Sequence, residues 1–409
     1  MTDVGIVMPV YKQKPEFLAL AIQSVLAQTY QKFRFILVID GAPEMEPLVQ
    51  TQVGQDQRVE ILAYPDNKGV AHALNTGFEP LLRDNRIQYL TWVSSDNIYD
   101  PHYLELLRAA LVKGSPELGL VYSSFRSIDD EGRQLNSEAE LASMHRYQSQ
   151  PEEKLLDSSI VGISFMYRSN YARLTGLYGM QPVEDYDYWL RLTEHCRMEH
   201  LPVELVDYRV NSSFSISASL KSEHAHRRWR YAYHLTRYQA RKRRGIASQL
   251  TVLFPLVHAR EHEIAIIENL YEQTYSNYIC TVLDLSESGQ PTEVLSNISH
   301  PTTSFNSFPG MKVTNSLLYA SYSISTPYTL VLGPKLFQEA VDLENLLDHA
   351  NQKGQLNEIS WFFSRGQVPR LTSSRLSSGQ GVVEKPDIFH EIFRTESLQQ
   401  LLESIVNGG

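Results

Sequence analysis

Asp96 stands in the segment of this sequence whose residue types are best suited to binding a metal ion. The apolar run Ile87–Val93 leads directly into Ser94-Ser95-Asp96-Asn97, which predicts a buried strand that ends in one carboxylate among small polar residues. In open α/β sheets, ligands bind at the carboxyl ends of the strands. A carboxylate at that place can bind a divalent cation through oxygen, and the cation can then bind a phosphate. The alternative is that Asp96 only caps the next helix.

Two further acidic segments have residue types that suit ligand binding or proton transfer. Asp40-Gly41 closes the apolar strand predicted at Phe33–Ile39, and Glu184-Asp185 precedes an amphipathic helical pattern. A carboxylate at a helix N-terminus is stabilised in its ionised form by the helix dipole and the free backbone amides. Such a group is suited to removing a proton from a hydroxyl. The alternatives are a strand-end turn at Asp40 and an ordinary acidic first helical turn at Asp185.

The elements that would position these residues alternate between strands and helices. Periodicity predicts six of them in the first part of the chain: strands at 5–11, 33–39, 59–63 and 87–93, and helices at 15–28 and 70–82. This alternation predicts an α/β fold with a doubly wound, mostly parallel sheet and helices on both faces.

Length and composition limit the classes of protein to which this chain can belong. Its 409 residues suggest two or three domains. Its net charge of −10 argues against a nucleic-acid partner, which would need a basic surface. The two cysteines, Cys196 and Cys280, imply no disulfide framework. Because the N-terminus lacks a signal-peptide pattern and the apolar runs are too short to span a bilayer, we expect a cytoplasmic protein.

Five short motifs occur in the order and spacing of a known family. They are Met8-Pro-Val-Tyr11, Asp40-Gly41, the segment Asn67–Gly77, Ser95-Asp96-Asn97 and Glu184-Asp185. Each motif alone is weak, but the five together, over roughly the first half of the chain, resemble the family 2 glycosyltransferases of the GT-A fold. The resemblance implies a metal-dependent, inverting, hexosyltransferase-like enzyme. Such an enzyme moves a sugar from a nucleotide-diphosphate donor to an acceptor hydroxyl.

The resemblance also implies a donor site built from the first four motifs. Asp40 would accept the N3–H of a uracil or thymine ring, which favours a UDP-sugar donor, with a dTDP-sugar second. The other implied donor-binding residues are Pro9, Val10 and Tyr11 along the nucleoside slot, Asn67 in the turn before a helix, and Ser95.

Metal and base roles follow from the last two motifs. Asp96 is implied as a ligand of Mg²⁺ or Mn²⁺, with the donor diphosphate completing the coordination shell. Many members of the family carry a second acidic residue where this chain has Ser95, so we expect weak metal binding that depends on the nucleotide. Asp185 is implied as the catalytic base, with Glu184 and Tyr186 on the acceptor side.

The implied acceptor is a hydroxyl of a cell-surface polysaccharide or glycoconjugate, including a lipid-linked glycan. The alternative class is a non-catalytic nucleotide-sugar or glycan-binding protein derived from such an enzyme. Ser95 favours this alternative, as does Asn211, which stands where the family often has a histidine that reaches the diphosphate or the metal. Asp96 and Asp185 favour the enzyme. The serine-rich segment that follows Asn211 is interpreted as a mobile lid.

A local concentration of basic and aromatic side chains occurs at residues 224–245. One interpretation is a linker helix whose arginines are solvated or paired with acids. The other is a cationic surface that makes a peripheral contact with anionic lipid headgroups, at the inner face of the membrane, or with a phosphorylated lipid-linked acceptor.

The second half of the chain repeats the pattern of the first. Leu250–Val257 corresponds to Val4–Tyr11, and Tyr328–Lys335 corresponds to Tyr89–Asp96. Lys335 therefore stands at the position of Asp96, so this half lacks the metal-binding carboxylate. We interpret it as a truncated, degenerate GT-A-like α/β domain that packs on the first half, forms a homodimer interface or serves as an acceptor platform.

The segment Phe393-Arg394-Thr395 near the end of the repeat corresponds to Tyr167-Arg168-Ser169. The predicted domains are thus a catalytic GT-A domain at 1–220, a basic linker helix at 221–247 and a non-catalytic domain at 248–409.

Overall fold

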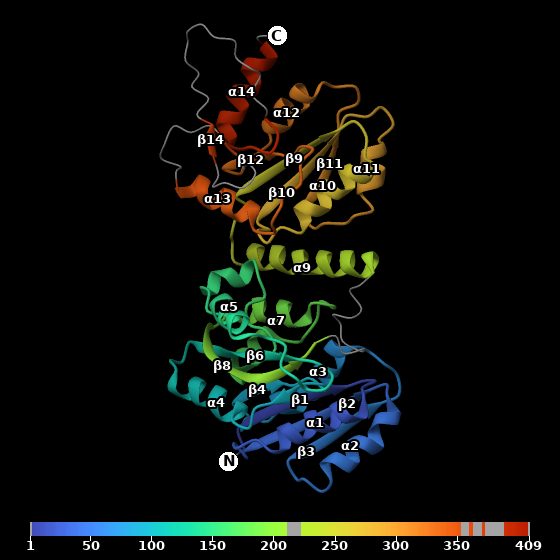
Figure 1. The fold of residues 1–409 in the computed structure, drawn as a ribbon, viewed down its shortest axis with the longest axis vertical. Coiled ribbons are helices and arrows are strands. Elements are labelled where there is room, and N and C mark those ends of the chain that lie inside the picture. The colour runs from blue at the N-terminus through green and yellow to red at the C-terminus, as the bar shows by residue number, and fades with distance from the viewer. Residues whose placement is uncertain (1, 211–221, 353–359, 363–369, 373–387, 408–409) are drawn as a thin grey trace. The chain divides into compact units, whose positions relative to one another are not determined.

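The computed structural model describes residues 2–210, 222–352, 360–362, 370–372 and 388–407. The chain separates into two compact units, residues 1–236 and 237–409. Each unit is built on one mixed sheet flanked by helices (Figure 1). The division falls inside α9 (Glu223–Arg243), between the domain boundaries predicted at residues 220 and 247.

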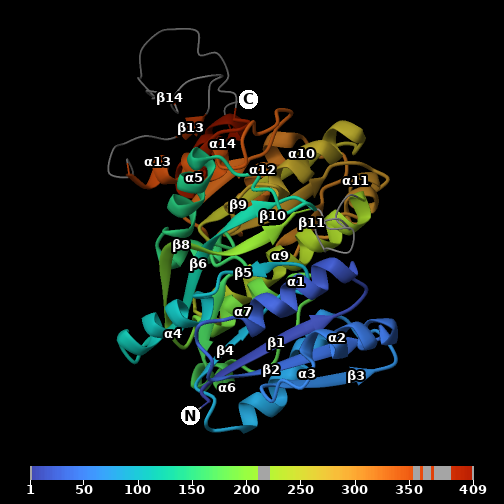
Figure 2. The ribbon, with the colours of Figure 1, turned by 60° about the horizontal axis from the view of Figure 1, so that its bottom comes forward.

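The first unit contains a sheet whose described strands have the order β3-β2-β1-β4-β7-β6-β8-β5. Strands β1 to β4 are parallel to one another, and β7 is antiparallel to both β4 and β6. Strands β6 and β8 run parallel and side by side (Figure 2). The bounds are β1 (Val4–Val10), β2 (Phe33–Asp40), β3 (Val59–Tyr64), β4 (Tyr89–Trp92), β5 (Ile98–Tyr99), β6 (Leu118–Ile128), β7 (Phe165–Arg168) and β8 (Arg197–Arg209).

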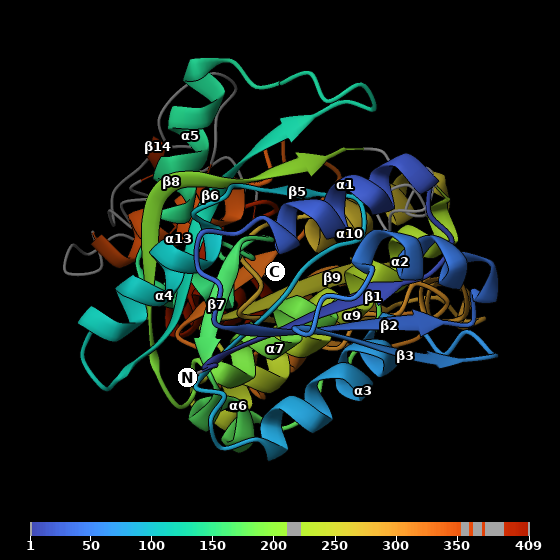
Figure 3. The same cartoon turned by 90° about the horizontal axis from the view of Figure 1, so that it is seen from below.

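Helices cover both faces of this sheet. Figure 3 shows α1 and α2 on one face of β1 to β3 and α3 on the opposite face. The predicted doubly wound, mostly parallel α/β architecture is therefore confirmed. The helices of the first unit are α1 (Pro15–Leu26), α2 (Glu46–Val53), α3 (Val70–Arg83), α4 (Tyr103–Lys113), α5 (Glu138–Gln148), α6 (Ser169–Thr175) and α7 (Glu184–Leu192), with 3₁₀ turns at Pro43–Met45 and Glu152–Leu156.

Close packing of α3 on the sheet fixes the position of the turn that precedes this helix. A Cβ atom on Gly77 would lie only 2.5 Å from Val7 Cγ1 and 3.1 Å from Val38 Cγ2, so only glycine permits this approach of α3 to β1 and β2. Strands β1 and β2 are buried almost throughout, as expected for parallel strands covered on both faces.

The described strands of the second unit have the order β11-β10-β9-β12-β15-β13-β14, which repeats the order of the first unit from β3 to β8. The last pair differs, because β13 and β14 are antiparallel where β6 and β8 are parallel. Its strands are β9 (Leu250–Leu256), β10 (Tyr278–Asp284), β11 (Thr303–Ser307), β12 (Tyr328–Val331), β13 (Ser360–Phe362), β14 (Arg370–Thr372) and β15 (Ile392–Arg394). Its helices are α10 (Glu261–Tyr271), α11 (Gln290–Leu295), α12 (Val313–Ser321), α13 (Asp342–Gln352) and α14 (Thr395–Asn407).

The pairing of residues between neighbouring strands matches in the two units, residue by residue. Val4 pairs with Tyr89 in the first unit, and Leu250 pairs with Tyr328 in the second. The antiparallel partner of Tyr89 is Arg168, and that of Tyr328 is Arg394. The predicted correspondence between the two halves is therefore confirmed in the sheets.

The basic segment at 224–245 forms α9 over most of its length. Arg230, Arg237 and Arg241 are buried, and Arg241 Nη1 donates a hydrogen bond to Ser276 Oγ at 2.9 Å. A lipid contact through this helix stays a prediction and would depend on its exposed basic residues. Within the described residues, no helix combines the length and the apolar character needed to cross a bilayer.

Candidate active site

A cavity of about 420 Å³ opens in the first unit where the carboxyl ends of β1, β2 and β4 meet the N-terminus of α7. All but one of the residues predicted to form the site line this cavity: Pro9, Val10, Tyr11, Asp40, Asn67, Ser95, Asp96, Glu184 and Asp185. They come from five separate segments, so the fold brings together residues that are far apart in the sequence.

Asp40 connects the end of β2 to the turn that starts α3. Its Oδ1 accepts the Lys68 amide N–H at 2.7 Å, and its Oδ2 accepts the Gly69 amide N–H at 2.9 Å. The Asn67 side-chain amide also donates to Asp40 Oδ2, at 3.1 Å. The Asp40 carboxylate therefore fixes the 67–69 turn at the edge of the cavity, and any role toward a nucleobase would be additional to this one.

Gly41 allows this contact to form. Its φ of +66° lies in the left-handed region, which favours glycine. A Cβ atom on Gly41 would lie 2.1 Å from the Asn67 backbone nitrogen. No other residue permits the turn to approach β2 so closely.

Asp96 follows β4 and is 8% exposed. Its Oδ1 accepts a hydrogen bond from Ser94 Oγ at 2.8 Å, and its backbone oxygen accepts one from Arg209 Nε at 3.2 Å. The carboxylate is therefore held in a defined position in the cavity lining, and His102, not Asp96, occupies the N-cap of α4.

Asp185 and Glu184 lie side by side in the first turn of α7. Burial raises the pKa of Asp185 well above its usual value, and the Glu184 carboxylate raises it further, whereas the Trp92 side chain acts in the opposite direction. Burial also raises the pKa of Glu184. The expected effect of the helix dipole is thus outweighed by desolvation. Asp185 consequently has a higher proton affinity than an ordinary aspartate.

Tyr186 does not line the cavity. Its side chain is 3% exposed, its hydroxyl donates to the Leu155 backbone oxygen at 2.6 Å, and its ring stacks on Tyr233 with centroids 4.5 Å apart. Since successive helical residues are rotated by about 100°, Tyr186 faces away from the side on which Asp185 lines the cavity. Asn211 and the serine-rich segment after it lie outside the described residues.

Sequence reasoning missed several residues that line the cavity, among them Lys12, Trp92 and Arg209. The Arg209 guanidinium lies over the Phe17 ring at 3.9 Å from its centroid. It also donates to the backbone oxygens of Asp129 and Asp130. Trp92 lies within the predicted buried strand 87–93 and was assigned no binding role. Arg209 lies at the end of β8, two residues before Asn211, in a segment where a role was assigned only to Asn211.

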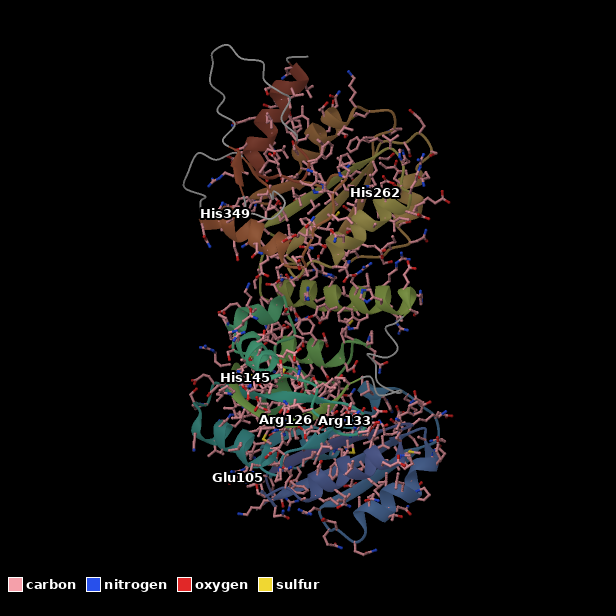
Figure 4. All side chains as sticks on the ribbon, in the orientation of Figure 1. Glu105, Arg126, Arg133, His145, His262 and His349 are labelled. Atoms are coloured by element: carbon pink, nitrogen blue, oxygen red, sulfur yellow. The ribbon has the colours of Figure 1, made fainter. Side chains whose placement is uncertain are left out.

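Two ion pairs lie close to Arg209, one between β6 and β8 and one in the turn after β6. Arg126 Nε on β6 lies 2.7 Å from Asp207 Oδ1 on β8. In the turn after β6, Arg133 Nε lies 2.7 Å from Asp129 Oδ2. Figure 4 labels Arg126 and Arg133 on the first unit. The first pair links β6 to β8, and the second holds Asp129, whose backbone oxygen accepts a hydrogen bond from Arg209.

The donor atoms of the cavity fit a divalent cation only in part. Asp96 supplies one hard oxygen ligand, of the kind that Mg²⁺ and Mn²⁺ prefer. In the described part of the chain, no group of three or more His, Cys, Asp or Glu side chains is arranged to hold a metal ion. A cation held by Asp96 would therefore need further oxygen ligands from a bound molecule, and a diphosphate has the chemistry to supply them.

Comparison with known proteins supports the resemblance found in the sequence. Residues 5–174 match the family model described as glycosyl transferase family 2. An uncharacterized glycosyltransferase of Rickettsia conorii is 26% identical over 205 residues, which is 47% of this chain and 31% of that protein. One from Rickettsia prowazekii is 28% identical over 194 residues, 46% of this chain and 58% of that protein. Residues 5–174 are therefore similar to the family 2 glycosyltransferases.

The matches also have clear limits. The aligned region spans less than two thirds of either relative. Among solved structures, Staphylococcus aureus TarS 1–349 in complex with UDP-GlcNAc has a TM-score of 0.45 at 10% identity and covers 57% of this chain and 66% of that chain. This likeness is too distant to support an argument about ligands.

Proposed function

We propose that the first unit is an inverting glycosyltransferase that moves a sugar from a nucleotide-diphosphate donor to an acceptor hydroxyl. One observation carries this proposal: a single cavity, within the region that matches the family 2 model and its flanking α7, contains both Asp96 and Asp185. One carboxylate suits the diphosphate end of a donor and the other suits the acceptor hydroxyl.

Asp185 acts as the base in the proposed reaction. The acceptor hydroxyl transfers its proton to the Asp185 carboxylate while its oxygen forms a bond to the anomeric carbon of the donor sugar. The bond between that carbon and the diphosphate oxygen breaks, and the nucleoside diphosphate leaves with the electron pair. Because this is one direct displacement, the anomeric configuration is inverted. A raised pKa makes Asp185 a stronger base than an exposed aspartate.

In this proposal Asp96 would be the protein ligand of Mg²⁺ or Mn²⁺ at the diphosphate end of the donor. The cation would supply charge stabilisation to the leaving diphosphate. The nucleobase lies near Asp40 and the 67–69 turn, with Pro9, Val10 and Tyr11 along the nucleoside. Asp40 as an acceptor for the N3–H of a pyrimidine fits uracil and thymine alike. UDP is therefore the first candidate for the donor nucleotide and dTDP the second.

Calorimetric titration of UDP and dTDP, each with and without Mn²⁺, tests the donor site. We expect UDP binding that strengthens with Mn²⁺ and is lost in Asp96→Ala. Glu79→Ala is the matched control, since Glu79 is an exposed acid on α3 that does not line the cavity. The absence of binding for both nucleotides would reject the proposed donor site.

Replacing Asp185 separates catalysis from binding. Asp185→Asn keeps the shape of the side chain but removes its basicity, so we expect transfer to fall by about 10²- to 10⁴-fold with UDP affinity unchanged. The assay measures sugar transfer to cell-surface polysaccharide or glycoconjugate fragments, including lipid-linked glycans. An unchanged transfer rate would reject Asp185 as the base.

A second candidate function is non-catalytic binding of nucleotide-sugars or glycans. Ser95 favours it, because Ser95 precedes Asp96 at a position where many members of the family that this chain resembles have a second acidic residue. Nucleotide binding without transfer to any acceptor fragment would select this candidate.

A further inference from the structure

The candidate active site contains three buried polar atoms that have no hydrogen-bond partner among the described residues. They are Trp92 Nε1, Glu184 Oε2 and Asp185 Oδ1, and all three residues line the same cavity. Buried polar groups in proteins are nearly always paired. An indole N–H can only donate and an ionised carboxylate can only accept, so the Trp92 N–H is suited to pairing with one of the two acids.

Aromatic packing brings Trp92 to the face of α7 that carries Asp185. The Phe165 ring on β7 packs edge-on against Trp92, with ring centroids 5.8 Å apart, and against Trp189, with centroids 4.3 Å apart. Trp189 lies four residues after Asp185 on α7, and residues at that spacing share one face of a helix. The Phe165 backbone oxygen also accepts a hydrogen bond from Thr91 Oγ1 at 2.7 Å, which holds β4 against β7. Asp185 therefore lies on the side of α7 that faces Trp92.

Trp92 acts on Asp185 rather than on Glu184. Burial, and then the Glu184 charge, raise the pKa of Asp185, whereas the Trp92 side chain lowers it. A hydrogen-bond donor has this effect because it stabilises the ionised form. Burial also raises the pKa of Glu184, and Trp92 has no part in that change. Asp185 is therefore the acid with which the Trp92 N–H can pair.

The two carboxylate oxygens of Asp185 have different surroundings. Oδ1 is buried, although the Asp185 side chain as a whole is only half-buried and lines the cavity. A ligand in the cavity therefore reaches neither Asp185 Oδ1 nor the buried Trp92 Nε1. Oδ2 is the Asp185 oxygen that remains to contact a ligand, and Oδ1 remains for a partner within the protein.

We propose that Trp92 is the positioning residue of the base: its indole N–H donates to Oδ1 of the ionised Asp185 and so directs Oδ2 at the acceptor hydroxyl. This inference rests on the proposed function. In the transfer step the hydroxyl proton moves to Oδ2, while the Trp92 N–H keeps its proton and stays with Oδ1. A hydrogen bond to one oxygen limits rotation of the carboxylate, and the other oxygen is then held in the geometry that proton transfer needs.

The indole N–H signals of the full chain test this pairing without any need for sugar transfer. The chain has four tryptophans, so an N–H correlation NMR spectrum has four indole signals, and the one lost in Trp92→Phe belongs to Trp92. We expect its proton to move to lower field as rising pH ionises Asp185, since a hydrogen bond to a charged oxygen is shorter and stronger. The movement should be absent in Asp185→Asn and should occur at lower pH in Glu184→Gln.

Other titratable groups near Asp185 are separated from it by these variants. Glu184 lies in the same helical turn. Burial, and then Tyr188 and Asp185, raise the pKa of Tyr178 well above its usual value, so Tyr178 stays neutral during the titration. The cavity lining adds further titratable side chains from other elements: Tyr11, Lys12, Asp40, Asp96, Tyr99, Tyr208 and Arg209. An effect of any of these groups on the Trp92 signal would persist in Asp185→Asn.

The pH–rate profile of Trp92→Phe gives a second readout. Loss of the N–H removes a bond to the ionised form, so the pKa of Asp185 rises further, and the acidic limb should move to higher pH by about one unit. Trp189→Phe is the matched control, because Trp189 Nε1 is also buried without a partner among the described residues, but Trp189 does not line the cavity. Its limb should stay in place, and UDP affinity by calorimetry should be unchanged in both variants.

A Trp92 signal that does not titrate, or that titrates equally in Asp185→Asn, would overturn the pairing. So would an acidic limb of Trp92→Phe that coincides with that of Trp189→Phe. If Trp92→Phe does not fold, Phe variants of the other three tryptophans, Trp189, Trp229 and Trp361, assign the Trp92 signal by elimination. A Trp92 signal that follows Asp185 in a chain that transfers no sugar would uphold the pairing and reject the proposed transferase, so the two failures are distinguishable.

Discussion

At the scale of single residues, burial has a larger effect on the acidic pair of α7 than the position of that pair at a helix N-terminus. The dipole and the free amides favour ionised carboxylates, but removal from water and mutual repulsion raise the pKa of Asp185. A base whose pKa is raised toward the working pH removes a proton more effectively. The environment that disfavours the charge of Asp185 is therefore also the one that would make it useful.

Glu184→Gln should move the acidic limb of the pH–rate profile to lower pH. Asp185 must be ionised to act as a base, so transfer falls as the pH drops through the pKa of Asp185. Removing the Glu184 charge lowers this pKa, although burial still holds it above the ordinary value of about 3.9. The measurement is kcat/KM for the donor as a function of pH, with Glu79→Gln as the control. An acidic limb that stays at the same pH or moves to higher pH would contradict the assigned repulsion between Glu184 and Asp185.

His200 should contribute to the dependence of stability on pH. Its ring bonds Ser124 Oγ at 3.0 Å and Ser149 Oγ at 2.8 Å, and it stacks on Tyr122. The other titratable groups at this place are His145 and its ion-pair partner Glu204. Burial, and then the charge of His145, lower the pKa of His200 to about 4.

Because the folded pKa of His200 is lowered, the neutral ring contributes stability that is fully present above about pH 6.5 and is lost as the pH falls toward 4. His200→Gln should therefore lose less stability between pH 7 and pH 5 than the wild-type chain. The measurement is the urea midpoint at both pH values, with the exposed His195→Gln as the control. Equal losses in His200→Gln and the wild-type chain would reject this role.

At the scale of elements, the approach of the 67–69 turn to β2 depends on Gly41. Gly41→Ala places a Cβ atom 2.1 Å from the Asn67 backbone nitrogen, whereas a Cβ on Gly132 meets nothing within 4 Å. Both glycines have positive φ, +66° and +80°, so both substitutions carry a backbone strain of about 1–2 kcal/mol. We expect Gly41→Ala to cost more than Gly132→Ala in the free energy of unfolding, and to weaken UDP binding as well. Equal effects of the two substitutions would show that the close approach is unimportant.

The residues at the carboxyl ends of the strands were the part of the site that the sequence predicted best. Asp40 and Asp96 follow apolar runs, and the ends of parallel strands meet at one edge, so local patterns placed both in one site. Tyr186 was misplaced by a single helical step, because a motif specifies neighbours in sequence but not which of them faces inward. Arg209 had no assigned role, since it joins the cavity lining through the pairing of β8 with β5 and β6, which come from distant parts of the sequence.

At the scale of the whole molecule, the two units share a topology but differ in the residues at their strand ends. Lys335 follows β12 at the position where Asp96 follows β4, as the matched pairing of Tyr328 and Tyr89 shows. Asp284 pairs with Leu256 as Ile39 pairs with Val10, so it stands one residue before the position of Asp40. The second unit therefore keeps most of the sheet but lacks the strand-end carboxylates of the proposed donor site.

The second unit should accordingly bind no nucleotide, and the full chain should bind one UDP. Asp284 is fully buried, and its two carboxylate oxygens accept four hydrogen bonds, from the backbone and side chains of Ser286 and Thr292. All its acceptor positions are thus used, and the ammonium of Lys335 would repel the cation that Asp96 is proposed to hold. Calorimetry of the full chain with UDP and Mn²⁺ should give one site, which Lys335→Ala leaves unchanged and Asp96→Ala removes. Two sites, or a site that survives in Asp96→Ala and is lost in Lys335→Ala, would place nucleotide binding in the second unit.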